Sequence, residues 1–172
     1  MSSNLFARVA GLVTICGIEL SLTGNFEPVS LDGFQQFNDS KPRGIVYQDA
    51  YHGKASVSFT EESDESNAGL SWKQSLSIRF PVTDERRAYR LATIHKVRFI
   101  KIKFSNDKSL IMGRNDFAQN ARPKIQSKTT EHLAEVQFQT VSIEPAGYTS
   151  FEDPDFFPNV FPIIINNTDP NE

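Results

Sequence analysis

Residues 70–82, LSWKQSLSIRFPV, carry the most regular pattern in the chain. Apolar side chains fall on every even position except Gln74. They are Leu70, Trp72, Leu76, Ile78, Phe80 and Val82. Because successive side chains of a β-strand point to opposite faces, this period of two predicts a strand with one face in a core. Pro81 lacks the N–H that a ladder needs, so it predicts a strand end or an edge position.

The segment before this strand predicts a neighbour for it. Val57 and Phe59 alternate with polar residues and predict a second strand that starts near Ala55. The run TEESDESNAG, residues 60–69, follows at once. It contains the carboxylates of Glu61, Glu62, Asp64 and Glu65. Such a dense cluster of like charges favours a solvated, hairpin-like connection between the two strands.

A single short helix is predicted after the strand. Residues 84–94, DERRAYRLATI, place Ala88 and Leu91 at helical spacing. Thr83 or Asp84 can cap the first turn, where a negative charge also favours the helix dipole. We therefore expect one helix that lies across a face or an edge of the sheet.

A hairpin with many basic residues is predicted next. Residues 96–112, KVRFIKIKFSNDKSLIM, contain two alternating runs around the turn residues 105–108. The alternation changes phase between Phe99 and Ile100, which predicts a β-bulge at that point. The basic side chains of its first strand, residues 96–103, are Lys96, Arg98, Lys101 and Lys103.

The remaining segments complete a mainly β fold with one short helix at about 84–94. Residues 9–23 and 131–145 alternate as strands, and 24–53 is a long connection rich in turn residues and aromatics. We expect an antiparallel β-sandwich or a barrel-like sheet in a single domain, residues 1–145, with an extended N-terminal loop. Residues 146–172 are too rich in proline for a helix and too apolar for a solvated tail, so they predict an extended arm with aromatic side chains that insert into pockets.

Composition argues against several kinds of site. His52, His95 and His132 are scattered and Cys16 stands alone, so no metal site or cofactor is expected among the 172 residues. The sequence has no glycine-flanked serine and no glycine-rich phosphate loop, and we expect a protein that is not an enzyme. A net charge of −3 gives no overall attraction for nucleic acid.

The N-terminal apolar run, residues 9–18, is ten residues long and too short to span a bilayer. Its surroundings also differ from a signal peptide, because Arg8 follows two apolar residues and Ile15 precedes Cys16. We therefore expect no export and no membrane contact.

The stretch IKFSNDKSLIMGRNDFAQNARPKIQSKTTEHLAEVQFQTVSIEP, residues 102–145, resembles virion proteins of the tailed-bacteriophage neck and tail. These are the tail-tube, tail-terminator and head–tail connector proteins. The resemblance lies in a hairpin, a polar loop and a long alternating strand that follow strand 70–82 and a short helix. It implies a structural subunit of a ring, made in the host cytoplasm and located in the virion. It also implies copies of itself and other virion proteins as partners, and possible indirect contact with DNA in a lumen.

Opposite charges on separate hairpins suggest where copies meet. We expect the basic residues of 96–103 to contact the acidic run of a neighbouring copy, with the aromatic side chains of the arm at the same interfaces. These are Phe151, Phe156, Phe157 and Phe161. A different interpretation is a monomeric β-sandwich that binds carbohydrate or a cell-surface ligand through aromatics of the 24–53 segment. These are Phe34, Phe37, Tyr47 and Tyr51.

Overall fold

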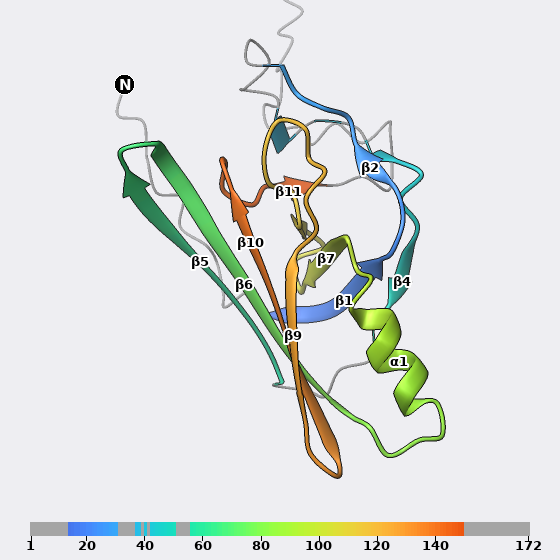
Figure 1. The fold of residues 1–172 in the computed structure, drawn as a ribbon. Coiled ribbons are helices and arrows are strands. Elements are labelled where there is room, and N and C mark those ends of the chain that lie inside the picture. Colours follow the sequence, from blue (N-terminus) through green and yellow to red (C-terminus); the bar gives the residue numbers. More distant parts are fainter. Residues whose placement is uncertain (1–13, 31–36, 39, 41, 51–55, 150–172) are drawn as a thin grey trace, which may run out of the picture.

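The computed structural model describes residues 14–30, 37–38, 40, 42–50 and 56–149. They form two larger antiparallel sheets, one two-stranded sheet and one helix (Figure 1). The prediction of a mainly β, sandwich-like fold with one short helix is confirmed.

The first sheet has five strands in the order β11-β8-β7-β1-β4. Their bounds are β1 Ile15–Ser21, β4 Tyr47–Asp49, β7 Phe99–Phe104, β8 Ser109–Met112 and β11 Tyr148–Thr149. The hairpin predicted in 96–112 is confirmed as β7 and β8. Asp107 lies in its turn with a φ of 61°, a conformation that Asp tolerates better than most residues. The sheet therefore joins both ends of the described chain around this central hairpin.

The second sheet has four strands in the order β5-β6-β10-β9. Their bounds are β5 Val57–Ser66, β6 Gly69–Pro81, β9 Lys124–Thr129 and β10 Leu133–Ser142. The strands predicted in 70–82 and 131–145 are β6 and β10, and Pro81 ends β6 as expected. Strand β9 was not predicted, because Ile125 is its one apolar residue.

Three short strands lie in the segment 24–53, which was predicted to be a loop. Strands β2, Asn25–Phe26, and β3, Pro42–Arg43, pair with each other, and β4 joins the edge of β1. Backbone pairing holds these strands, and two or three residues are too few to show a period in the sequence.

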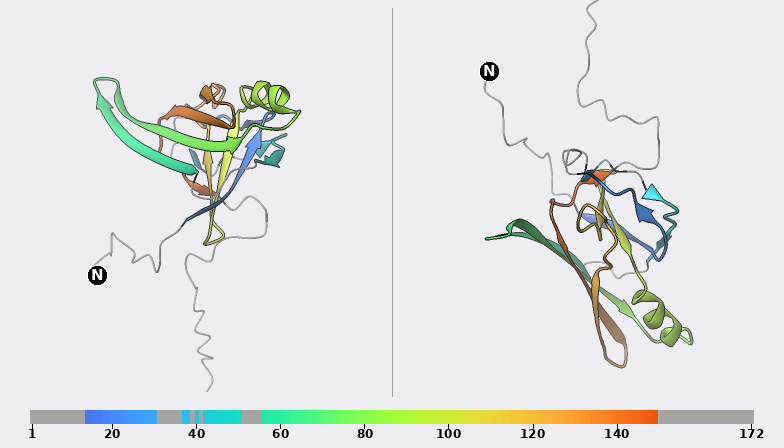
Figure 2. Two further views of the ribbon diagram at one scale, coloured as in Figure 1. Left: turned by 90° about the horizontal axis from the view of Figure 1, so that it is seen from below. Right: turned by 45° about the horizontal axis from the view of Figure 1, so that its top comes forward.

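Helix α1, Arg87–Ile94, begins three residues later than predicted. Asp84 lies before it and does not act as the cap: its carbonyl accepts the N–H of Arg87 at 3.2 Å, and its carboxylate pairs with Arg90. Leu91 and Ile94 pack against the core between the sheets, so the helix covers one end of the sandwich (Figures 1 and 2).

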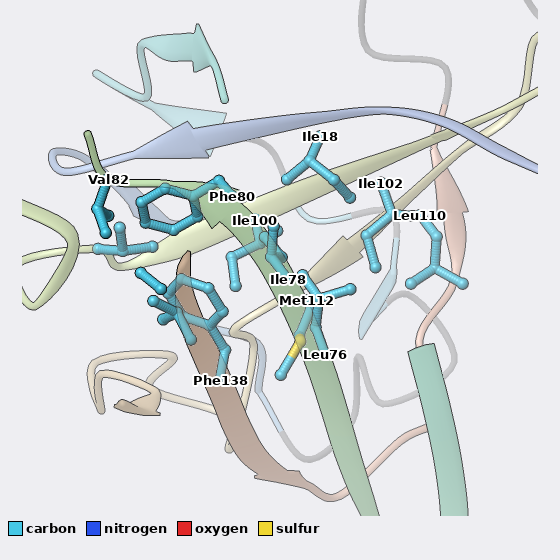
Figure 3. Packing of buried hydrophobic residues seen from close by; sticks show 13 residues of the cluster. Ile18, Leu76, Ile78, Phe80, Val82, Ile100, Ile102, Leu110, Met112 and Phe138 are labelled. Carbon is cyan, nitrogen blue, oxygen red and sulfur yellow. The ribbon is translucent and has the colours of Figure 1, made fainter. Parts of the chain in front are cut away.

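The main core lies between the two large sheets. Figure 3 shows apolar side chains of β6 and β10 meeting those of β1, β7 and β8. The labelled members are Ile18, Leu76, Ile78, Phe80, Val82, Ile100, Ile102, Leu110, Met112 and Phe138. The even positions from Leu76 to Val82 are therefore core, as the alternation predicts, while Trp72 is half-buried and Leu70 is exposed.

The bulge predicted between Phe99 and Ile100 is wrong. The register between β7 and β1 runs without a break from Phe99↔Ser21 to Ile102↔Ile18. The phase of the pattern changes because β7 is buried on both faces. Phe99 packs on the outer side of the sheet against Phe26, with ring centroids 4.9 Å apart and planes at 89°.

The β5–β6 hairpin extends beyond the sandwich. Strand β10 pairs with β6 only as far as Trp72, whereas β5 and β6 remain paired up to Ser66 and Gly69. Figure 2 shows the tip standing clear of the five-stranded sheet. A paired ribbon that leaves its own core is suited to contact another molecule.

Candidate functional site

The acidic run lies in strand β5 and not in the solvated connection that was predicted. Glu61 pairs with Gln74 and Glu62 with Lys73, and the turn is confined to two residues, Asn67 and Ala68. Tertiary pairing with β6 overrides the low strand propensity of clustered carboxylates. The residues of this run consequently form one edge of the four-stranded sheet.

The carboxylates of β5 divide between the two faces of the sheet. Glu61 points inward, where one oxygen accepts Nε2–H of Gln74 at 3.0 Å and the N–H of Ala146 at 2.8 Å. Asp64 points outward and pairs with Nζ of Lys73 at 2.5 Å, which raises the pKa of that ammonium group. Glu62 and Glu65 are exposed. The edge therefore carries negative charge on both faces.

The opposite edge of the same sheet is basic. Strand β9 contributes Lys124 and Lys128, both exposed, and its six residues contain no acidic side chain. In the described chain β9 pairs with β10 alone, just as β5 pairs with β6 alone. These two lysines were not among the predicted interface residues, because only the structure shows that they lie on a sheet edge.

Two of the four predicted basic interface residues are paired within the chain. Lys101 is 5% exposed, and its Nζ lies 3.4 Å from Oε2 of Glu19 on the neighbouring strand β1. Lys103 also pairs with Glu19. The prediction that these lysines meet the acidic run of another copy is therefore wrong for Lys101, which is buried.

The other two predicted basic residues lie between α1 and β7, next to His95, whose Nε2 lies 3.1 Å from Oγ of Ser127 on β9. Lys96 is exposed after the end of α1. Arg98 is half-buried, and its guanidinium carbon lies 5.8 Å from the centre of the Phe99 ring. Both residues therefore lie outside β9 itself.

Tyr47 lies beside Lys101 on the outer side of the five-stranded sheet. Nζ of Lys101 is 5.5 Å from the centre of its ring. Burial raises the pKa of the Tyr47 hydroxyl, nearby Arg114 opposes that shift and Glu19 adds to it. Among the described residues this buried hydroxyl has no hydrogen-bond partner.

Replacing Tyr47 with phenylalanine is expected to raise the free energy of unfolding by up to about 1 kcal/mol, because it removes a buried polar group without a partner. Urea denaturation of the two proteins measures the difference. A loss of stability of the same size would show that the hydroxyl is hydrogen-bonded.

Arg114 is a buried residue that the sequence did not single out. It is 3% exposed and lies between the rings of Phe26 and Phe37, at 4.3 and 4.8 Å from their centres. Its guanidinium donates to the carbonyls of Phe37 and Asn38 and to the side chain of Gln119. It therefore fastens the segment around residue 38 to the loop after β8.

The aromatics expected to bind a ligand are only partly described. Phe37 is 2% exposed and packs on Arg114. Tyr47 packs against a second core cluster, formed by Phe26, Phe99 and Ile111. Phe34 and Tyr51 lie outside the described residues, as do the predicted interface residues of the arm. The latter are Phe151, Phe156, Phe157 and Phe161. The two described aromatics therefore contribute to the packing of the fold.

The parts of the chain that the structure describes hold neither a cluster of metal ligands nor a helix that could span a membrane. No three side chains of His, Cys, Asp or Glu there come close enough to hold a metal ion. No helix there combines the length and hydropathy that a bilayer crossing requires. Comparison with protein-family models, curated proteins and solved structures finds no match to this chain. The two sheet edges are therefore interpreted from their own geometry and charge.

Proposed function

We propose that this chain is a non-enzymatic structural subunit of a phage particle, which assembles into a ring by pairing β5 of one copy with β9 of the next. The resemblance of residues 102–145 to neck and tail proteins supports the phage context. The observation that carries the assembly is the pair of oppositely charged edges on one four-stranded sheet. An unpaired edge presents N–H and C=O groups that another strand can use.

The strand directions suit such a ring. Each neighbouring pair in the order β5-β6-β10-β9 is antiparallel, so β5 and β9 run in opposite directions. Copies related by rotation about an axis along the strands all have the same orientation. The β9 edge of one copy then meets the β5 edge of the next as an ordinary antiparallel pair.

Charge favours this head-to-tail pairing over a symmetric dimer. Pairing β5 with a second β5 would bring eight carboxylates together, four from each copy. Pairing β9 with a second β9 would oppose lysines. Like charges across an interface cost several kcal/mol, whereas opposite charges favour association and fix the register.

The stagger of a closed sheet brings the charges together. Within one sheet, Lys124 of β9 is in register with Gln139, Gln139 with Ser75, and Ser75 with Thr60 of β5. Copies that pair without an offset would therefore place Lys124 beside Thr60. Closed sheets require neighbouring strands to be offset, and an offset of about four residues places Lys124 beside Asp64 on the same outer face. The long β5 leaves room for such an offset, because it extends beyond the level at which β9 begins.

Reversing the charge of one edge is expected to abolish the ring. In the double variant Lys124→Glu/Lys128→Glu, the altered β9 edge would face the carboxylates of β5 in the next copy. We expect association to weaken by more than a hundredfold, because like charges would replace opposite charges across the interface. Light scattering coupled to size exclusion, over a concentration series, measures native mass, and negative-stain microscopy identifies rings or tubes.

Two further variants make this test specific. Glu62→Lys/Asp64→Lys, which reverses the charge of the outer face of β5, should also be monomeric, and mixing it with the first variant should restore rings, because the outer face of each β5 then meets a β9 of opposite charge. Arg86→Glu/Lys108→Glu, in the turns before α1 and between β7 and β8, changes the net charge equally and should assemble normally. A monomeric wild-type protein at every concentration, or rings that survive both edge variants, would contradict the proposed pairing.

A further inference from the structure

An apolar groove opens between the two sheets beside α1. It has a volume of about 310 Å³, near the lower end of the range of ~300–1,000 Å³ typical of ligand pockets. Its apolar lining comes from β1, β6, β10 and the segment before β7. These residues include Leu20, Leu22, Ile78, Phe80, Val97 and Phe138. The groove is thus an extension of the core that opens to the surface.

Side chains of α1 form one side of this groove. Tyr89 is 72% exposed, although it is a large aromatic residue, and Arg90 lies beside it with its guanidinium carbon 6.0 Å from the Phe80 ring. Arg90 pairs with Asp84, but its buried Nε has no hydrogen-bond partner among the described residues. Asp49, at the end of β4, is the other charged residue that lines the groove. The groove therefore combines an apolar floor with a rim that holds one arginine and one aspartate.

The sequence after β11 has the complementary composition. Residues 150–161, SFEDPDFFPNVF, place aromatic residues next to three acids, Glu152, Asp153 and Asp155. Such a segment can offer aromatic rings to the apolar floor and a carboxylate to Arg90. We propose that residues 150–157 of one copy dock into the groove beside α1 of another copy. This inference rests on the proposed function, because it requires copies to assemble.

The geometry of β11 favours a second copy over the same chain. Strand β11 and strand β7 are both antiparallel to β8, so β11 runs in the direction of β7. The groove is lined by Val97, which precedes β7. Thr149 of β11 and Lys103 near the end of β7 are both in register with Ser109 of β8, so the two lie at the same height in the sheet. The chain consequently leaves β11 heading away from its own groove, about 20 Å from it along the strand.

The length of chain after Thr149 supports the same conclusion. Phe156 follows Thr149 by seven residues. A turn that reverses direction uses about four of them, and the remaining three span at most about 11 Å. Phe156 and Phe157 therefore follow Thr149 by too few residues to reach back to their own groove. An arm that leaves one end of the sheet and a groove at the other end join copies head to tail along the strands, which is an open-ended arrangement.

Disulfide trapping between two full-length chains tests the docking. Cys16 is exposed and is replaced by serine in every variant. One chain carries Tyr89→Cys and the other Phe157→Cys, so a mixed disulfide between them can form only across copies. We expect rapid formation of this heterodimer under mild oxidation. The Arg90→Glu substitution in the first chain should slow it at least tenfold, because a carboxylate would then face the acids of the arm.

A matched control replaces Tyr89→Cys by Val141→Cys, which is 57% exposed on β10. It should give at least tenfold less heterodimer. Equal trapping at both sites would overturn the proposal, and so would an internal disulfide when Tyr89→Cys and Phe157→Cys are placed in one chain. If native mass still shows rings while Tyr89→Cys traps nothing, the docking is wrong and the proposed function stands. If the protein is monomeric and traps nothing, both fail.

Discussion

Replacing Phe138 with alanine is expected to lower the free energy of unfolding by about 3–5 kcal/mol. Phe138 is fully buried on β10, between Leu76 of β6 and Ile125 of β9. Its ring fills the space between the two sheets (Figure 3). Removing it leaves a cavity that strands paired on both sides cannot close, so the transfer and cavity costs add. Urea denaturation followed by Trp72 fluorescence measures the loss.

The control for this variant is Val141→Ala on the same strand. Val141 is 57% exposed on the opposite face, so its truncation should change stability by no more than about 0.5 kcal/mol. A loss below about 1 kcal/mol for Phe138→Ala would mean that the two sheets do not pack as described. The slope of the denaturation curve should be the same for all three proteins, because each unfolds from the same fold.

Replacing Glu19 with glutamine is expected to lower the free energy of unfolding by about 3 kcal/mol. The substitution keeps the size of the side chain and removes the charge that neutralises Lys101, whose side chain is 6% exposed. A buried ammonium group that loses its carboxylate partner costs far more than an exposed one. Urea denaturation measures this loss as well.

Two companion variants separate the buried pair from the exposed one. Lys103→Met removes the second partner of Glu19. The Lys103 side chain is 35% exposed, so this substitution should lower the free energy of unfolding by only about 0–1 kcal/mol. The double variant Glu19→Leu/Lys101→Met replaces the buried pair by apolar groups and should recover most of the loss. A Glu19→Gln variant with unchanged stability would show that Lys101 does not depend on this carboxylate.

The parts of the fold that could be predicted are those with long, regular patterns. Strands β6 and β10 and the β7–β8 hairpin show alternation over many residues, and their burial follows it. Strands β4 and β11 are too short to carry a period, and β9 has one apolar residue. The phase change at Phe99 was misread as a bulge because the sequence does not show that a second apolar cluster covers the other face.

The candidate site was predictable in part. The acidic run was recognised from its composition, but its place in β5 depends on pairing with Lys73 and Gln74. Lys101 looked exposed, because Glu19, which neutralises it, lies far away in the sequence. The basic edge was not predicted, because its two lysines become an edge only through the order of the strands. Lys124 and Lys128 are ordinary polar residues until the order of the strands places them opposite the acidic edge.

The long-range register between β1 and β7 has a consequence for the order of folding. Ile18 pairs with Ile102, so β1 cannot join its sheet until most of the described chain has been synthesised. The β5–β6 and β9–β10 hairpins need only local contacts, and local contacts form fastest because they close short loops. Both charged edges therefore belong to ribbons that can form before the sandwich closes. We expect repulsion between like edges to disfavour pairing of neighbouring nascent chains through the same strand.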